Sequence, residues 1–153
     1  MAWQSYELDR IAQKLVLDAQ GRDLAAKKIN PKEPGSLNQA HKMRMAIAYG
    51  LERFWGEHLR LKGKKASDEN KSKLWKATWD DFCGVMANVD IKLPKDAVKP
   101  EDNKKILDIS EQLWDLPVED QRVAIAVLTQ LCDCIVWWTQ RYKTGRMADE
   151  SDS

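Results

Sequence analysis

The chain has 153 residues, 43% of them hydrophobic and 32% charged, and its formal net charge is +1. That length is sufficient for one domain with a buried core that needs neither disulfides nor a metal. Seven glycines and five prolines are too few for a chain of short strands and turns. We therefore expect an all-α protein, a single compact bundle of about five helices over residues 1–145, followed by a disordered acidic tail over residues 146–153.

The first twenty residues carry five charged side chains, which interrupt any apolar core of a signal peptide. No later window is expected to reach the length of a membrane span. The three cysteines, Cys83, Cys132 and Cys134, are odd in number and lie in apolar helical patterns, which suits reduced thiols better than a disulfide framework. These features predict a cytoplasmic protein with no membrane partner.

Charge is divided unevenly along the chain. Residues 1–76 hold sixteen basic and nine acidic side chains, a formal charge of +7, whereas residues 77–153 hold nine basic and fifteen acidic ones, a charge of −6. One molecule could therefore offer a basic surface to phosphates while its acidic part meets a basic neighbour, and copies could stack head to tail. A chance division of solvating surface charges explains the same count.

Two helices are expected in the first part of the chain. Apolar residues at helical spacing, with Ser5 as N-cap, predict a first helix that continues to about Lys28, where the segment NPKEPG ends it. Ser36 can cap a second helix that extends to about Lys62. Along this second helix His58 falls on the same face as the apolar residues.

Three further helices complete the prediction. A third helix is expected from near Ser67 to Asn88, and the irregular segment VDIKLPKDAVKPEDN then crosses the surface or reaches a neighbour. A short fourth helix follows Asp102. The fifth begins at Pro117 or at the acidic segment VED that follows it, and is the most apolar segment of the chain. It is expected to be the central helix, ending at Gly145.

Arg53 and His58 have the R-x4-H spacing found in helical ribonucleases and toxins of the HEPN type. Resemblance to that family would imply that an arginine and a histidine from two subunits converge on a scissile phosphate, which suits histidine titration near neutrality and the charge of arginine. Two features favour a packing role for the histidine instead. The residue after the arginine is Phe54, where that family usually has a polar residue, and His58 lies on the apolar face.

No motif for a metal or a cofactor is found. Cys132 and Cys134 are two residues apart on a helix, which turns their side chains about 200° from each other and prevents them from sharing one ion. The sequence contains no G-x-x-x-x-G-K-[ST] loop, G-x-S-x-G elbow or H-E-x-x-H helix. We therefore expect no metal site, no cofactor and no catalytic residue.

Ten basic residues flank the end of the second helix and the start of the third, and are candidates for RNA binding. They are Lys42, Arg44, Arg53, Arg60, Lys62, Lys64, Lys65, Lys71, Lys73 and Lys76. A loop rich in glycine and lysine lets several ammonium groups approach a phosphate backbone without reading sequence, although a solvated loop has the same composition.

Tryptophans supply the other candidate contacts. Trp55 and Trp75 could stack on bases. Packing in the core is the alternative, and it is favoured for Trp75 because Trp75 and Trp79 share an i, i+4 face. Trp137 and Trp138 lie about 100° apart on a helix, so one should be buried and the other should lie at the margin of the bundle as a protein interface.

The ending ILDISEQLWDLPVEDQRVAIAVLTQLCDCIVWWTQRYKTG resembles that of the small α-helical subunits of type III CRISPR effector complexes. There a short leucine-containing helix precedes a long apolar helix that ends in aromatic residues, a basic residue and glycine. The segment NQAHKMRMAIAYGLERFW is similar to the early basic helix of that family, whereas the insertion from Lys92 to Lys105 departs from its compact pattern. The resemblance implies a non-catalytic subunit, present in several copies along a ribonucleoprotein filament, that touches the guide and target RNA through basic side chains.

Three functional hypotheses follow. The first is a structural RNA-binding subunit whose partners are RNA and the other subunits of a ribonucleoprotein complex. The second is a HEPN-like ribonuclease that uses Arg53 and His58. The third is a protein-only helical adaptor in which exposed tryptophans form the interface.

Overall fold

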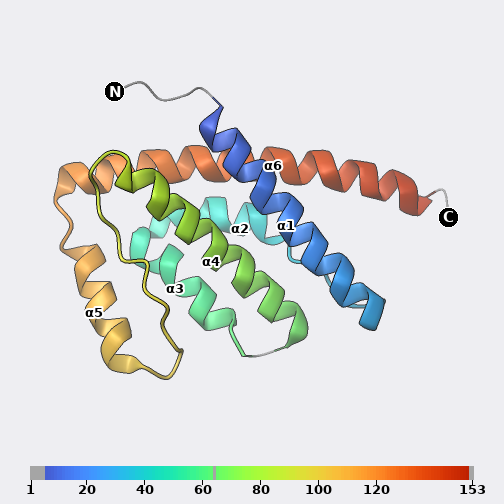
Figure 1. Ribbon diagram of the computed structural model, residues 1–153, viewed down its shortest axis with the longest axis horizontal. Helices are drawn as coiled ribbons and strands as arrows, with labels where there is room; N and C mark the ends of the chain where they lie inside the picture. The colour runs from blue at the N-terminus through green and yellow to red at the C-terminus, as the bar shows by residue number, and fades with distance from the viewer. Residues whose placement is uncertain (1–5, 64, 152–153) are drawn as a thin grey trace.

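The computed structural model describes residues 6–63 and 65–151, with side chains described for residues 6–63, 65 and 67–142. The described residues form an all-α bundle of six α-helices and one 3-10 helix, with no strand among them (Figure 1). In chain order these are α1 (Glu7–Ile29), α2 (Gln39–Ala46), η1 (Ile47–Tyr49), α3 (Leu51–Leu61), α4 (Ala66–Ala87), α5 (Asn103–Trp114) and α6 (Val118–Ser151).

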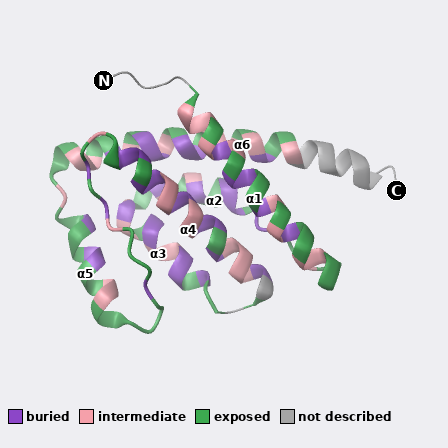
Figure 2. Cartoon of the chain, in the orientation of Figure 1, coloured by how far each residue is buried: buried purple, intermediate pink, exposed green. Residues whose placement is uncertain are grey.

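The helices pack around α4 and α6. Helix α1 lies across both α4 and α6, α2 packs on α6, and α3 packs on α4 (Figure 1). The long α6 runs along one side of the molecule, and its buried residues face α1 and α2 (Figure 2). The predicted compact all-α bundle with a long apolar C-terminal helix is confirmed.

The predicted helix from Ser36 to Lys62 is interrupted at Gly50, so the bundle has six helices rather than about five. Gly50 has φ 98° and ψ 171°, a backbone conformation that is essentially restricted to glycine. The chain turns there through η1, and α3 starts in a new direction on the next residue. Apolar periodicity continues across the break because both helices bury one face, which is why the sequence pattern does not reveal it.

An aromatic cluster joins α3 to α4. The ring centroid of Phe54 lies 4.9 Å from that of Trp75 and 6.3 Å from that of Trp79, and Trp79 lies 5.5 Å from Phe82. All four side chains are at most 1% exposed. Their tilted ring geometry is the one that aromatic pairs prefer, and removing one such side chain from a core typically costs about 3–5 kcal/mol.

The most apolar stretch of the chain is Val118–Tyr142, and it is long enough to cross a membrane by length and composition, with a mean hydropathy of 1.3 over its best window. The expectation that no segment reaches this length is therefore wrong. In the folded chain Ala124, Leu128, Leu131 and Ile135 are completely buried against neighbouring helices. The core helix of a soluble protein has the same composition, and the structure is compatible with one.

Helix α6 does not stop at the expected Gly145, because its backbone remains helical to Ser151. A glycine inside a helix costs only about 1 kcal/mol relative to alanine, and the following Arg146, Met147 and Ala148 are good helix formers. Their side chains lie outside the described residues. Disorder of the tail over residues 146–153 stays a prediction, as does the domain boundary at residue 145.

The first and third helices follow the predicted bounds. Helix α1 reaches Ile29 and α4 ends at Ala87, each within one residue of expectation, while the proposed cap Ser5 lies outside the described residues. Asp102 caps α5, since its carboxylate accepts a hydrogen bond from the backbone N–H of Lys105 at 3.2 Å. Such a cap satisfies a backbone donor that would otherwise be left unpaired at the helix start.

The irregular connection between α4 and α5 is fixed to the bundle rather than crossing only its surface. Its residues Ile91, Leu93 and Val98 are buried. The indole N–H of Trp79 donates to the carbonyl of Pro94 at 2.9 Å. The expectation of a surface crossing missed these apolar residues, whose spacing has no regular period.

Gly50→Ala is expected to destabilise the protein by about 1–3 kcal/mol, because an alanine Cβ does not fit the glycine-only backbone conformation. The matched control is Gly84→Ala in α4, where a Cβ would meet nothing within 4 Å. That change should be neutral or stabilise by up to about 1 kcal/mol. Urea unfolding of both variants measures the difference. Equal effects of the two changes would show that the break at Gly50 imposes no backbone constraint.

Candidate nucleic-acid interface

A groove of about 610 Å³ lies on the surface formed by α2, η1 and α3. Its basic side chains are Lys42, Arg53 and Arg60, three of the ten residues predicted to bind RNA. Tyr49 also lines the groove and is 70% exposed. The remaining lining residues are Met45, Ala46, Glu52, Gly56 and Glu57. The groove thus combines cations with one accessible aromatic ring.

The turn at Gly50 is what brings these side chains together. Lys42 belongs to α2 and Arg53 to α3, and Tyr49 ends the 3-10 turn that directly precedes Gly50. The guanidinium of Arg53 lies over the Tyr49 ring, 5.5 Å from its centroid, in a cation–π arrangement. Because the two helices diverge at the turn, residues from both of them line one groove.

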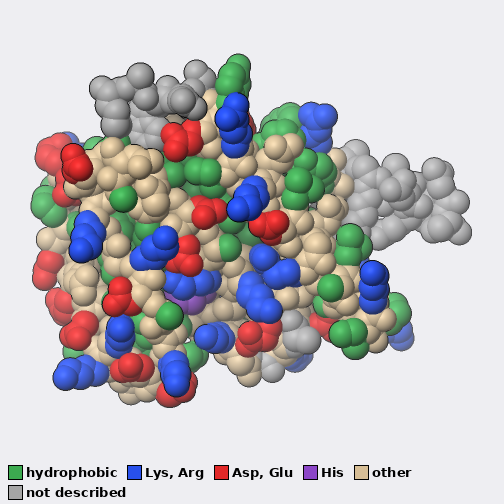
Figure 3. All heavy atoms as spheres, viewed as in Figure 1, with side chains coloured by type: hydrophobic (Ala, Val, Ile, Leu, Met, Phe, Trp, Pro, Cys, Tyr) green, Lys and Arg blue, Asp and Glu red, His purple; other side chains and the backbone are tan. Residues whose placement is uncertain are grey.

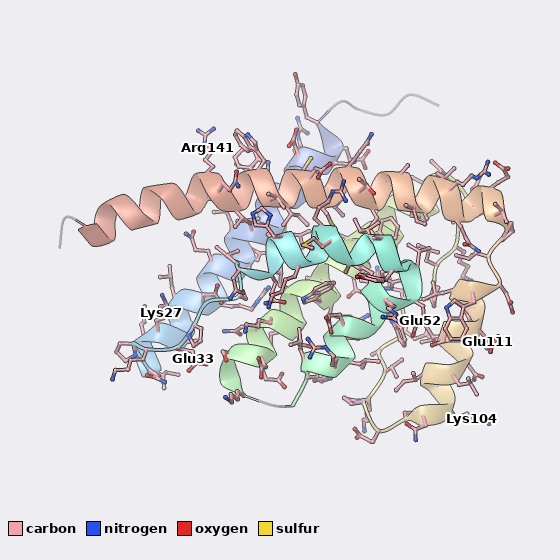
Figure 4. The ribbon with its side chains drawn as sticks, turned by 180° about the vertical axis from the view of Figure 1, so that it is seen from behind. Lys27, Glu33, Glu52, Lys104, Glu111 and Arg141 are labelled. Atoms are coloured by element: carbon pink, nitrogen blue, oxygen red, sulfur yellow. The ribbon has the colours of Figure 1, made fainter. Side chains whose placement is uncertain are left out.

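The charges of the groove are only partly compensated. Arg60 is paired with Glu57 one helical turn earlier, and this hydrogen bond raises the pKa of Arg60. Glu52 accepts a hydrogen bond from the hydroxyl of Ser110 in α5 at 3.0 Å, and its direction toward α5 is visible in Figure 4. Lys42 and Arg53 form no ion pair within the described part of the chain. Two cations are therefore free to meet an anion.

Three other predicted contacts are engaged with acidic neighbours. Arg44 donates to Asp133 of α6 at 2.7 Å, Lys76 pairs with Asp80 at 2.7 Å, and Lys71 pairs with Asp68 at 3.8 Å. Basic and acidic side chains are interspersed over much of the face shown in Figure 3. The nine of these residues that the structure describes are therefore divided between the groove, ion pairs with carboxylates and solvent-exposed positions in or near the loop after α3.

The loop after α3 places the remaining lysines in solvent. Lys62, Lys65 and Lys73 are exposed, whereas Lys64 lies outside the described residues. Gly63 has φ 83°, which turns the chain sharply after Lys62. These lysines are accessible to a phosphate backbone, and none of them is among the residues that line the groove.

The tryptophans considered for base stacking belong to the core. Trp55 and Trp75 are each 1% exposed, and the indole N–H of Trp75 donates to the side chain of Gln39 at 3.1 Å. Stacking on a base is excluded for both in this fold. The accessible aromatic residue of the groove is Tyr49, which sequence reasoning missed because it lies off the apolar stripe and beside no basic run. Its position directly before Gly50 is the signal that could have found it.

His58 is a core residue, 4% exposed, with its ring against Trp55 at a centroid separation of 5.8 Å. Its Nδ1–H donates to the backbone carbonyl of Trp55 in this tautomer, and burial lowers its pKa from 6.5. Arg53, on the same helix, points to solvent. The predicted packing role for the histidine therefore agrees with the geometry, and the two residues do not form one site within the chain.

The thiols are protected rather than reactive. Burial raises the pKa of Cys83 and of Cys132 to about 12, and that of Cys134 to about 11. A thiol with such a pKa carries almost no thiolate at neutral pH. No group of histidine, cysteine and carboxylate side chains that could hold a metal ion occurs among the described residues.

Trp137 and Trp138 occupy different environments, as their spacing on the helix predicts. Trp137 is 52% exposed, whereas Trp138 is half-buried and packs against the core. The two rings meet edge to face at 4.8 Å. Trp137 is thus the marginal residue, and its use as a protein interface stays a prediction.

Comparison with protein families, with curated proteins and with solved structures finds no match for this chain.

The buried histidine predicts a specific pH dependence of stability. The unfolded chain takes up a proton on His58 near pH 6.5, while burial keeps the folded side chain neutral to lower pH. The unfolded state therefore binds more protons below this value, and the free energy of unfolding should fall as the pH drops through 6.5. Urea unfolding of wild type between about pH 8 and pH 5 should show this decrease in the free energy of unfolding. In His58→Gln the decrease should be absent.

The matched control is His41→Gln, since His41 is the chain's other histidine and is exposed. This variant should keep the pH dependence of wild type. An unchanged profile in His58→Gln would mean that another group carries the proton linkage.

Proposed function

We propose that the chain is a non-catalytic RNA-binding subunit of a ribonucleoprotein complex, and that the groove of α2, η1 and α3 contacts the RNA backbone. The observation that carries the proposal is the convergence of Lys42, Arg53 and Arg60 around the exposed Tyr49. The resemblance of the C-terminal segment to small subunits of type III CRISPR effector complexes makes a complex of that type the favoured setting, in the cytoplasm.

The chemistry of the groove fits a single strand read without sequence preference. Lysine and arginine neutralise phosphates and release condensed counterions, and this term depends on charge rather than on base identity. Tyr49 offers a ring face on which any base can stack. The expected affinity is therefore electrostatic and sequence-tolerant.

The burial of His58 speaks against the ribonuclease hypothesis. A general acid or base must come within hydrogen-bonding reach of its substrate, and a ring that is 4% exposed inside the bundle does not reach a phosphate. The groove itself contains no histidine among its lining residues. A binding role requires only the cations and the one aromatic ring that line the groove.

The proposal predicts a salt-dependent affinity that the groove controls. The triple change Lys42→Gln, Arg53→Gln and Arg60→Gln should weaken binding to single-stranded RNA. It should also flatten the plot of log affinity against log salt by about 2 units, because each phosphate contact in a single strand contributes about 0.7. Fluorescence anisotropy of a labelled oligonucleotide over a salt series measures both effects.

The matched control neutralises three exposed lysines elsewhere, Lys92, Lys99 and Lys104, with the same loss of charge. That variant should keep the salt slope of wild type. A third variant, with Lys62, Lys64 and Lys65 changed to alanine, measures how far the loop after α3 adds to the groove. Equal slopes for the groove variant and its control would overturn the groove as the contact.

The same oligonucleotide separates binding from cleavage. Purified wild type should leave single-stranded RNA intact without added metal. His58→Ala should lower stability, and its folded fraction should bind RNA as wild type does. Cleavage by wild type that is absent in His58→Ala would refute the proposal and favour a ribonuclease.

A further inference from the structure

A second cleft lies between the start of α1 and the middle of α6, apart from the basic groove. Its volume is about 620 Å³, within the range of about 300–1,000 Å³ typical of small-molecule sites. The cleft contains three aromatic side chains, Tyr6, Trp137 and Trp138. The other lining residues are Asp9, Arg10, Gln13, Asp133 and Cys134.

The inner wall of the cleft is held in place by contacts between the two helices. The indole N–H of Trp138 donates to the carboxylate of Asp9 at 3.3 Å. The ring of Trp138 stacks on Tyr142 with a centroid separation of 5.8 Å and an interplanar angle of 25°. The Tyr142 hydroxyl in turn accepts a hydrogen bond from Gln13 at 3.0 Å. Both ends of this chain of contacts lie on α1, so the wall is formed before any ligand arrives.

The outer aromatic residues are accessible. Trp137 is 52% exposed and Tyr6 is 68% exposed. Each therefore leaves part of a large apolar side chain in contact with solvent. Trp137 meets Trp138 edge to face at 4.8 Å, which fixes the angle of its ring. A planar ligand can therefore stack on a ring whose orientation is already set, which reduces the entropy lost on binding.

The charges around the cleft favour a ligand that is anionic rather than cationic. The guanidinium of Arg141 lies 5.6 Å from the centroids of both Trp137 and Trp138, and Arg141 projects from the side of α6 in Figure 4. Arg10 lines the cleft from α1. Neither arginine has an acidic partner within the part of the chain that the structure describes.

The two carboxylates of the cleft are already engaged. Asp9 accepts from Trp138, and Asp133 pairs with Arg44 at 2.7 Å. A ligand cation such as a quaternary ammonium would be repelled by Arg10 and by Arg141. A flat aromatic group that carries a phosphate meets both the rings and the two free guanidinium groups.

We propose that this cleft binds one base of single-stranded RNA, stacked on Trp137 and Tyr6, with Arg10 and Arg141 facing the adjacent phosphates. The inference rests on the proposed function and adds a second contact to it. The two sites are linked through the packing of α2 on α6, since Lys42 in α2 lines the groove and Arg44, two residues later, is bonded to Asp133 in the cleft.

The first experiment uses free nucleotide and does not depend on the groove. Adenosine monophosphate should shift the indole N–H signals of Trp137 and Trp138 in the NMR spectrum of the full chain, whereas ribose 5-phosphate should not. The shifts should persist in the variant with Lys42, Arg53 and Arg60 neutralised. Absence of any shift in the two indole signals at saturating nucleotide would overturn the cleft as a base-binding site.

The second experiment uses a short oligoadenylate. Stacking of one base on an aromatic side chain contributes about 1–3 kcal/mol, so Trp137→Ala should weaken binding between about 5-fold and 150-fold. Trp137→Phe, which keeps a ring, should lose less. The matched control is Trp114→Ala, because Trp114 in α5 is 59% exposed and lies outside both sites. It should leave the affinity unchanged.

The outcomes distinguish the two proposals. Equal affinities of Trp137→Ala and wild type for the oligoadenylate, with a normal salt slope, would overturn the cleft and leave the groove. Binding of adenosine monophosphate without binding of the oligoadenylate would refute the proposed function and the RNA ligand together, and would show a site for free nucleotide. A change of oligomeric state in Trp137→Ala on sedimentation, with no nucleotide shift in wild type, would assign the cleft to contact between copies.

Discussion

The contact between Phe54 and Trp75 is central to the packing of the bundle, because it joins α3 to α4. Helix α1 packs on α4 in turn. The rings of this aromatic cluster are buried, and so are Trp55 and His58, which the sequence offered as functional residues. A core that requires so many large rings leaves few of them for the surface. The exposed aromatic residues that remain are therefore the more informative ones.

Both candidate sites arise where two helices meet at an angle. Gly50 turns α3 away from α2, and residues of both helices line a groove together with Tyr49. The crossing of α1 over α6 opens the other, with Trp137 at its edge. In each place an aromatic ring is held by a neighbouring arginine, and the cations outnumber the carboxylates that remain unpaired. Both places thus combine an exposed aromatic ring with positive charge. A polyanion with planar bases would require this combination.

The sequence pattern predicted the helices well, because the burial of one helix face imposes a period that can be read directly. It could not predict the break at Gly50, since the period continues across it, nor the anchoring of the segment around Pro94, since an irregular segment has no period. Residue type alone gave the ten basic candidates. Only the fold shows that Lys76 and Arg44 are paired with carboxylates, while Arg53 has no ion pair among the described residues and lies over the Tyr49 ring. Tyr49 was missed for a related reason, because accessibility depends on where the chain turns.

The side chains of the Arg44–Asp133 ion pair are both exposed, Arg44 by 43% and Asp133 by 60%. The pair therefore adds little to the stability of the fold. Its consequence concerns the ligands instead. Asp133 lines the aromatic cleft, and its pairing with Arg44 offsets one of the negative charges that an anionic ligand there would meet.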